Sequence, residues 1–299
     1  MIFNSVLDTI GNTPLVRLHN IEKKYKVDGE LYAKVEYYSP GLSKKDRIAK
    51  YIIEKAIKEG KLKKGQTVIE QTSGNTGIGL ALVCSILGYP FIAVMSKGNS
   101  IERVKMIEAF GGKVELVDKV STGEGVSKED MEAVEKRYNE LSKELKAFPV
   151  NQFSNIDNAW AHYYTTGEEI LKDLNNVDVF VDYVGTGGSF VGISKRLKEH
   201  HKCLCYKVIP DKNTHLIQGG GYFKDIPFEE ENSCDGEIVV SSEEALEMSE
   251  ELAKLEGLYV GVSSGANLAA AFKILKENPN KKVVFLLNDV GLKYLSVGK

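Results

Sequence analysis

The chain has 299 residues, with 39 Lys and Arg side chains against 42 Asp and Glu, and a formal net charge of -3. This near balance gives no basic excess that would favour nucleic acid or an anionic membrane surface as a partner. With 42% hydrophobic residues, the composition also argues against a disordered, collagen-like or coiled-coil chain.

Seven short apolar runs predict β-strands, and segments with helical periodicity separate them. The strands are expected at 31–37, 67–70, 91–95, 113–117, 177–184, 205–209 and 283–287. The helices are expected at 46–58, 77–87, 101–110, 128–142, 161–174, 190–199, 243–256 and 266–276. Apolar strands that alternate with helices are typical of parallel sheets covered on both faces, so the sequence predicts an α/β fold.

Two polar segments, 121–130 and 215–237, interrupt this pattern. The first predicts a surface loop. The second contains three consecutive glycines and an acidic stretch, which is typical either of a flexible surface loop or of a gate over a cleft.

The N-terminus and the cysteines favour a reduced, cytoplasmic setting. The N-terminus lacks the basic start and the apolar core of a signal peptide. Cys84, Cys203, Cys205 and Cys234 show no metal-binding spacing, so the sequence predicts reduced thiols and no metal site. The uncharged stretch 71–96 contains several glycines and a Gly-Tyr-Pro turn, which predicts a loop, a buried helix and a strand rather than a membrane span.

Two glycine-rich loops each follow a predicted strand and precede a predicted helix. They are 72–77, with the sequence TSGNTG, and 185–189, with the sequence GTGGS. Helix N-termini present free N–H groups at the carboxyl ends of parallel strands, so both loops are candidate anion sites, although a tight turn explains a single such loop equally well. Neither is a P-loop, and Phe190 stands where a dinucleotide motif needs its third glycine, so a single phosphate fits the second loop better.

A lysine pair precedes the predicted helix 46–58. Lys44 and Lys45 follow a Pro-Gly turn, and Ser43 is a suitable N-cap for the helix. The positive N-terminus of a helix lowers the pKa of a partly buried lysine and frees its amine to act as a nucleophile. On this pattern one lysine is a candidate nucleophile, and two ordinary surface lysines are the alternative.

Six motifs, in order along the chain, resemble those of the cysteine synthase and cystathionine β-synthase family of pyridoxal phosphate (PLP) enzymes, in the fold type II, tryptophan synthase β-like group. The resemblance covers nearly the whole chain. The motifs are IGNTPL at 10–15, SKKDR at 43–47, TSGNTG at 72–77, HYYTTGEEI at 162–170, GTGGS at 185–189 and GVSSG at 261–265.

The resemblance implies two domains, each an open, mostly parallel twisted sheet with helices on both faces. Residues 1–39 together with 150–299 would form the larger, cofactor-binding domain. Residues 40–149 would form the smaller, movable, substrate-binding domain. Members of the family are usually homodimers, so a homodimer is expected here too.

The resemblance also assigns residues to PLP and to the substrate. Lys45 would form the Schiff base with PLP and later move the α-proton, which leaves Lys44 as a bystander. Asn75 would face the 3′-oxygen of PLP, and Ser263 its pyridine nitrogen. The residues expected to hold the phosphate are Gly185, Thr186, Gly187, Gly188 and Ser189. The residues expected to bind the α-carboxylate of the substrate are Thr72, Ser73, Thr76 and Gln152.

A serine at the pyridine nitrogen has a chemical consequence. Unlike a carboxylate, the Ser263 hydroxyl cannot keep the nitrogen protonated, so the ring is a weaker electron sink. Loss of a β-leaving group is then the expected path, giving an α-aminoacrylate to which a nucleophile adds. The leading expectation is therefore a β-replacement enzyme, a cysteine synthase acting on O-acetylserine and sulfide.

The loop at 218–225 departs most from the family pattern, and its Tyr222 and Asp225 would lie near the entrance for the second substrate. An acidic group there can handle a proton on a leaving thiol or an attacking water, so Asp225 is a candidate catalytic residue. A solvated loop carboxylate is the alternative. With the catalytic role, the enzyme would be a cysteine lyase that releases hydrogen sulfide, while water or another thiol adds in its place.

Two further functions are compatible with the family. A serine or threonine dehydratase shares the first half-reaction, but that group has a different, serine-rich substrate loop. The second is a non-catalytic partner role, because some members bind the C-terminal tail of serine acetyltransferase. The presence of Lys45 argues against this last function.

Overall fold

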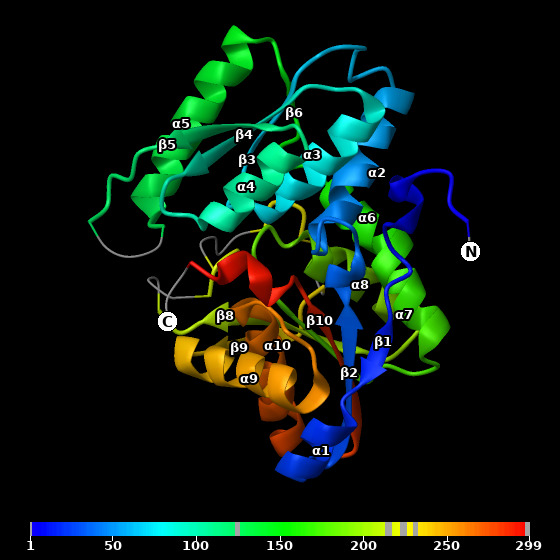
Figure 1. Ribbon diagram of the computed structural model, residues 1–299. Coiled ribbons are helices and arrows are strands. Elements are labelled where there is room, and N and C mark those ends of the chain that lie inside the picture. Colours follow the sequence, from blue (N-terminus) through cyan, green and yellow to red (C-terminus); the bar gives the residue numbers. More distant parts are fainter. Residues whose placement is uncertain (1, 123–125, 213–216, 222–225, 230–232, 297–299) are drawn as a thin grey trace.

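The computed structural model describes residues 2–122, 126–212, 217–221, 226–229 and 233–296, and within them ten strands form two sheets. Figure 1 shows the two sheets in separate halves of the molecule, the smaller one and its helices above the larger one. The mostly parallel α/β fold class expected from the sequence is confirmed. The domain boundaries near residues 39 and 149 stay a prediction.

The larger sheet has six strands, and every neighbouring pair is parallel except β1 and β2. In spatial order its strands are β1 (Leu15–Arg17), β2 (Gly29–Val35), β10 (Lys281–Leu287), β7 (Val179–Tyr183), β8 (Leu204–Pro210) and β9 (Gly236–Val240). The last strand in sequence, β10, therefore lies between β2 and β7, with Val283 opposite both Leu31 and Val179.

The smaller sheet has four strands, all parallel to their neighbours. In spatial order they are β5 (Lys113–Val117), β4 (Phe91–Ser96), β3 (Val68–Gln71) and β6 (Phe148–Pro149). Its connecting helices are α2 (Lys45–Lys58), α3 (Asn75–Leu87), α4 (Ile101–Ala109) and α5 (Lys128–Glu144).

The remaining helices lie in the segments that precede, join and follow the strands of the larger sheet. They are α1 (His19–Tyr25), α6 (Asp157–His162), α7 (Glu168–Asp173), α8 (Gly188–Lys198), α9 (Ser242–Glu256) and α10 (Val262–Glu277). Short 3-10 segments are η1 (Val6–Thr9), η2 (Glu36–Tyr38) and η4 (Gly291–Tyr294).

Helix α3 accounts for the uncharged stretch at 71–96. Every residue from 76 to 84 in this helix is buried, and the following strand β4 is also almost wholly buried. The apolar run therefore belongs to the core of the smaller sheet. Among the residues that the structure describes, no helix is both long enough and apolar enough to span a membrane.

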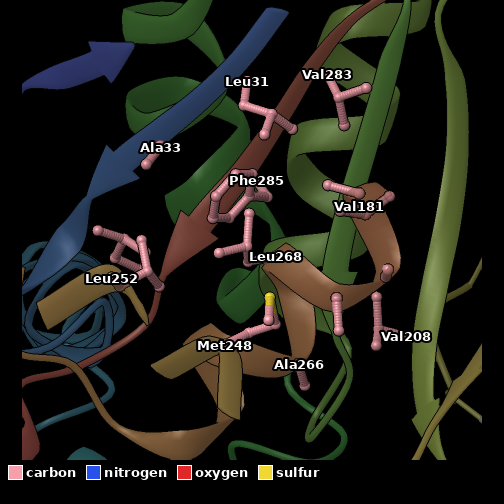
Figure 2. Packing of buried hydrophobic residues seen from close by; sticks show 14 of the residues in the cluster. Leu31, Ala33, Val181, Val208, Met248, Leu252, Ala266, Leu268, Val283 and Phe285 are labelled. Atoms are coloured by element: carbon pink, nitrogen blue, oxygen red, sulfur yellow. The ribbon is translucent and has the colours of Figure 1, made fainter. Parts of the chain in front are cut away.

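The main hydrophobic core lies on the face of the larger sheet that α9 and α10 cover. Figure 2 shows Leu268 of α10 close to Phe285 of β10, and Met248 of α9 and Val181 of β7 belong to the same cluster. These positions follow from the period of two along each strand, which sends alternate side chains to opposite faces. Burial of this set is the main stabilising contribution to the fold of the larger sheet.

Strand β7 is buried on both faces, and this decides where its one charged residue points. Val181 belongs to the cluster under α9 and α10, whereas Phe180 packs with Phe190 of α8 on the opposite face. By the same alternation, Asp182 points to the α8 face. Its side chain is wholly buried, so it needs a polar partner there.

The helix expected at 161–174 is instead broken into two, α6 and α7, by a π-helical turn η3 (Tyr163–Gly167). Within this turn the Thr165 hydroxyl donates to the backbone carbonyl of Ala161 over 2.6 Å. The Thr166 hydroxyl contacts the buried His162 Nδ1 at 2.9 Å. Side-chain bonds of this kind compete with the regular helical pattern, and the helical period alone does not reveal them.

Helices α9 and α10 approach so closely that a methyl group cannot fit between them. A Cβ built on Gly265 would lie 1.9 Å from the carbonyl oxygen of Ala245 and 2.6 Å from the backbone nitrogen of Ser249. We expect Gly265→Ala to lower the free energy of unfolding by about 1–3 kcal/mol, because the two backbones must move apart. Urea unfolding measures this, with exposed Lys276→Ala on the same helix as a control. An unchanged midpoint for Gly265→Ala would contradict the packing.

Candidate functional site

A cleft with two lobes lies at the carboxyl ends of β3 and β7, where the two glycine-rich loops meet. The larger lobe has a volume of about 580 Å³ and the smaller lobe about 400 Å³. Both lobes are lined by Lys45, Asn75, Gly185, Thr186 and Gly219. The carboxyl ends of parallel strands are where open α/β sheets bind ligands, so this cleft is the candidate site.

Lys45 is the first residue of α2 and faces both lobes. Burial, together with the nearby positive charge of Lys44, lowers the pKa of its amine to about 7. At pH 7 roughly half of such amines are neutral, against about 1 in 3000 for an ordinary lysine of pKa 10.5. Lys45, the expected nucleophile, therefore lies in the cleft and has a reactive, partly neutral amine at pH 7.

Ser43 does not cap helix α2 in the way expected. The helix begins at Lys45, so the cap position falls on Lys44, which makes no side-chain capping bond. The Ser43 hydroxyl accepts from the backbone N–H of Lys45 at 3.3 Å. The chain is held here by a bridge between Ser43 and Asp289, which moves the helix start by one residue.

Lys44, expected to be a bystander, is buried and has two polar partners. Its Nζ donates to the Asp182 carboxylate at 3.0 Å and to Ser189 Oγ at 2.8 Å. The Ser189 hydroxyl in turn donates to Asp182. Neither the partner Asp182 nor the contact was anticipated, although an acidic residue inside an apolar parallel strand is the signal that points to it.

The glycine-rich loop at 185–189 lines the smaller lobe and opens helix α8. The lining residues from it are Gly185, Thr186, Gly187 and Ser189. Gly188 packs away from the cavity, where a Cβ would lie 2.0 Å from Asn158 Oδ1. The first N–H groups of α8 have no acceptor inside the helix, so the loop offers the N–H donors that a phosphate requires.

Ser263, near the start of α10, lines the smaller lobe opposite this loop. Its Oγ accepts a hydrogen bond from Asn288 Nδ2 at 3.2 Å. Because that bond uses a lone pair of the oxygen, the hydroxyl hydrogen remains available to a ligand. Asn288 Oδ1 is buried and has no hydrogen-bond partner among the described residues, so a polar ligand is favoured at this end of the lobe.

Asn75 is held by the chain segment that follows β10. Its Nδ2 donates to Asp289 Oδ2 at 2.7 Å, and its Oδ1 accepts from Lys293 Nζ at 2.9 Å. Tyr294 also donates to the Asp289 carboxylate. Burial lowers the pKa of Lys293 to about 8. These three supporting residues were not predicted, because no local pattern relates positions so far apart in the sequence.

Three of the four residues expected to bind a carboxylate line the larger lobe: Ser73, Thr76 and Gln152. The Thr76 hydroxyl donates to Gln152 Oε1 at 2.6 Å. Thr72 does not line either lobe, and its Oγ1 accepts from the backbone N–H of Gly74 at 2.9 Å. Unanticipated lining residues of the larger lobe are Asn99, Val126, Met131 and Phe153.

Two of the six motifs, IGNTPL and HYYTTGEEI, meet Arg47 in a buried ionic network away from the cleft. The guanidinium contacts Glu36 at 2.6 Å and Glu169 at 2.6 Å, and it donates to Thr13 Oγ1 at 3.0 Å. Thr13 belongs to the IGNTPL motif and Glu169 to the HYYTTGEEI motif. These motifs therefore brace helix α2, which carries Lys45, rather than contact a ligand.

Tyr222 and Asp225 lie outside the described residues. The start of their loop is described, and Gly219 and Gly220 line the larger lobe. The role of Asp225 stays a prediction. Among the residues that the structure describes, no group of three or more His, Cys, Asp or Glu side chains is placed to hold a metal ion. Cys84, Cys203, Cys205 and Cys234 carry free thiols, and the Cys203 and Cys205 sulfurs lie 3.8 Å apart.

Comparisons with known proteins identify the family. A family profile described as "Pyridoxal-phosphate dependent enzyme" matches residues 6–289. Cysteine synthase B of Campylobacter jejuni is 39% identical, and the match covers 99% of this chain and 98% of that protein. The crystal structure of a hydrogen sulfide-producing enzyme from Fusobacterium nucleatum is 44% identical with a TM-score of 0.89, over 98% of this chain and 100% of that one. An O-acetylserine dependent cystathionine β-synthase from Helicobacter pylori is 34% identical with a TM-score of 0.91, over 100% and 99%.

Proposed function

Because the chain belongs to the pyridoxal-phosphate dependent enzymes, and among them to the cysteine synthase and cystathionine β-synthase family, we propose that it catalyses β-replacement on a serine-derived amino acid. The most favoured reaction is cysteine synthesis from O-acetylserine and sulfide. The observation that carries the proposal is that Lys45, with its pKa lowered to about 7, faces both lobes of the cleft.

The smaller lobe fits PLP. It offers an amine for the aldehyde at Lys45, N–H donors for the phosphate at the start of α8, and a hydroxyl for the ring nitrogen at Ser263. The unpartnered Asn288 Oδ1 is a further polar group at this lobe. Asn75, fixed by Asp289 and Lys293, is proposed to face the 3′-oxygen.

When bound, PLP supplies an electron sink for the bond that breaks at Cα of the substrate. Ser263 leaves the ring nitrogen without a full charge, which favours loss of the β-substituent over transamination. The Lys45 amine would take the α-proton of the substrate. Ser73, Thr76 and Gln152 are proposed to hold the α-carboxylate in the larger lobe, and residues 40–149 to move as a smaller domain.

The reaction is tested with the PLP-loaded enzyme and two substrates. With O-acetylserine and sulfide, we expect cysteine and acetate in equal amounts. With O-acetylserine alone, the visible absorption band should shift and then decay slowly. No cysteine above the rate without enzyme would contradict the proposal, and pyruvate from serine would favour the dehydratase instead.

A second candidate reaction is release of hydrogen sulfide from cysteine. It is favoured by the 44% identity to the hydrogen sulfide-producing enzyme, which exceeds the 39% identity to cysteine synthase B. The loop that begins at Gly219 borders the larger lobe and leads to Asp225, the proposed acid or base. Sulfide release with serine or a thioether as the second product would establish this direction. If Asp225→Asn leaves both reactions unchanged, Asp225 has no catalytic role.

The proposal extends to assembly, location and partner. A homodimer is supported by an aromatic surface, since Tyr164 is 59% exposed and stacks with Tyr51 and Trp160. Light scattering tests it. The reduced cysteines support a cytoplasmic location, which cell fractionation tests. Serine acetyltransferase is proposed as a partner through its C-terminal tail, and binding of a peptide ending in isoleucine tests that contact.

Gln152→Glu should selectively weaken amino-acid binding. Glutamate has nearly the same shape and can still accept the hydrogen bond from Thr76. It loses the donation from Gln152 Nε2 to the Gln71 carbonyl, and it places a negative charge where the α-carboxylate is proposed to bind. We expect kcat/KM for O-acetylserine to fall about 10- to 100-fold, mainly through KM. Steady-state kinetics measure this, with PLP absorbance as the control for cofactor loading. An unchanged KM would remove Gln152 from the carboxylate site.

The lowered pKa of Lys45 predicts how PLP loading depends on pH. Only the neutral amine attacks an aldehyde, so the loading rate of PLP-free protein should rise with pH and level off above about 7. An ordinary lysine would continue to gain rate up to about pH 10. Stopped-flow absorbance between pH 6 and pH 9.5 distinguishes the two curves. A rate that still rises steeply above pH 8.5 would contradict the lowered pKa.

A further inference from the structure

Lys44 is a buried charge that the proposed reaction leaves without a role. It is 6% exposed, and its ammonium nitrogen lies 3.0 and 3.1 Å from the two carboxylate oxygens of Asp182. Ser189 Oγ lies 2.8 Å from the same nitrogen. A buried ion pair is costly to form and is often replaceable by apolar residues, so its presence beside a ligand cavity calls for a functional explanation.

The ion pair is oriented with its positive end toward the cavity. Lys44 is among the residues that line the smaller lobe, whereas Asp182 is wholly buried and is not. Asp182 points from strand β7 to the face that α8 covers, and α8 begins at the glycine-rich loop. The positive charge of the ammonium therefore reinforces the partial positive charge of the N–H groups at the start of α8, and both attract an anion.

The hydrogen bonds of Ser189 show that its hydroxyl is already engaged. A serine hydroxyl has one hydrogen to donate, and Ser189 gives it to Asp182 while it accepts from Lys44. Its expected donation to a phosphate would break the bond to Asp182. The Lys44 ammonium has three N–H donors. One N–H shared by the two Asp182 oxygens and one directed to Ser189 leave the third for a further acceptor.

We propose that Lys44 is a cofactor-binding residue, which donates a charge-assisted hydrogen bond to the phosphate of PLP, and that Asp182 and Ser189 hold it in position. The inference rests on the proposed function in that it requires PLP in the smaller lobe. A lysine held by a carboxylate from behind is a fixed point charge for a phosphate dianion. The neutral loop alone would bind the phosphate through N–H groups and hydroxyls.

The test compares PLP with pyridoxal, which has the same ring and aldehyde but no phosphate. The PLP-free protein is titrated with each ligand, and the ratio of the two dissociation constants removes the contributions of the bond to Lys45 and of the ring contacts. The variant is Lys44→Met combined with Asp182→Asn, because Lys44→Met alone would leave a buried carboxylate without its counter-charge. Lys58→Met, exposed on the same helix, is the matched control.

We expect PLP to bind the double variant about 10- to 100-fold more weakly than the wild type, while pyridoxal binding changes by less than about twofold. Equal binding of both ligands to variant and wild type would show a purely structural ion pair and overturn the inference. An equal loss for both ligands would overturn it as well. Lys44→Gln, which can still donate to Asp182, repeats the comparison if the double variant does not fold.

Failure of this inference is distinguishable from failure of the proposed function. If wild-type protein binds PLP with the expected absorption band and the ratio is unchanged in the variant, the phosphate role of Lys44 is wrong and the cofactor assignment stands. If wild-type protein does not bind PLP at all, the proposed function and the inference fall together. Apo-protein thermal unfolding, measured beside each titration, shows that every variant compared is folded.

Discussion

Lys45→Ala is expected to lower turnover by a factor of about 10³ or more, because the same amine both binds the cofactor covalently and moves the α-proton. Lys44, its neighbour in sequence, should not replace it. Its ammonium is held by Asp182 and Ser189, whereas the Lys45 amine faces both lobes. The loss should appear in kcat, and PLP should still bind non-covalently in the smaller lobe.

Borohydride reduction followed by peptide mass mapping makes this result specific. In the wild type the reduced cofactor should be attached to Lys45, and in Lys45→Ala no lysine should carry it. Lys58→Ala, on the exposed side of the same helix, is expected to keep full turnover. Label on Lys44, or turnover of Lys45→Ala above a few per cent, would contradict the assignment.

Arg47→Met is expected to lower the free energy of unfolding by about 3–5 kcal/mol, because it removes the guanidinium that Glu36 and Glu169 share and leaves Lys34 as the cation beside Glu169. The melting temperature should fall by roughly 6–15 °C. Arg137→Met is the matched control: its guanidinium also contacts a glutamate, Glu115 at 2.8 Å, but its side chain is 37% exposed. Pairs of that kind contribute less than about 1 kcal/mol.

The loss should also depend on pH. Burial alone raises the pKa of Glu169, but hydrogen bonds and charge from Arg47 hold it at about 2, below its ordinary value of 4.5. In the wild type its stabilising contribution is present above pH 4.5 and is lost as pH falls through about 2. Without the guanidinium, Lys34 and the backbone N–H of Asn12 still contact Glu169, but one cation is missing beside two buried carboxylates. The variant should therefore lose stability as pH rises and these carboxylates ionise. Unfolding at pH 5 and pH 8 tests this, and a smaller deficit at pH 8 would contradict it.

The fold could be predicted well because its signals are local. The apolar runs at β2, β4 and β7 are long and largely buried, so each can be recognised as a strand without knowledge of the strands that pair with it. Strands β1 and β6 could not be recognised in this way, because segments of three and two residues are too short to show the alternation of a strand. Strand β9 begins at the end of the polar segment 215–237, and its alternating burial depends on pairing with β8 and on packing of Ile238 and Val240 against the core under α10.

Site residues could be proposed from the sequence where they lie within a recognisable local motif, as Lys45, Thr76 and Gly187 do. They were less predictable where distant segments meet. Asp289 and Lys293 reach Asn75 from the far end of the chain, and no spacing rule relates them. The contact of Lys44 was not anticipated for the same reason, because its partner Asp182 lies 138 positions away.

The order of strands in the larger sheet also constrains how the protein is made. Strand β10 separates β2 from β7, yet it leaves the ribosome last of the ten. Until residue 287 has emerged, β1 and β2 on one side and β7, β8 and β9 on the other have no common neighbour, and each presents an unpaired edge. Pairing of Leu31 with Val283 closes a very long loop, which makes this step slow. The nascent chain therefore depends on protection of these edges, and its yield should respond to chaperone supply more than its final stability suggests.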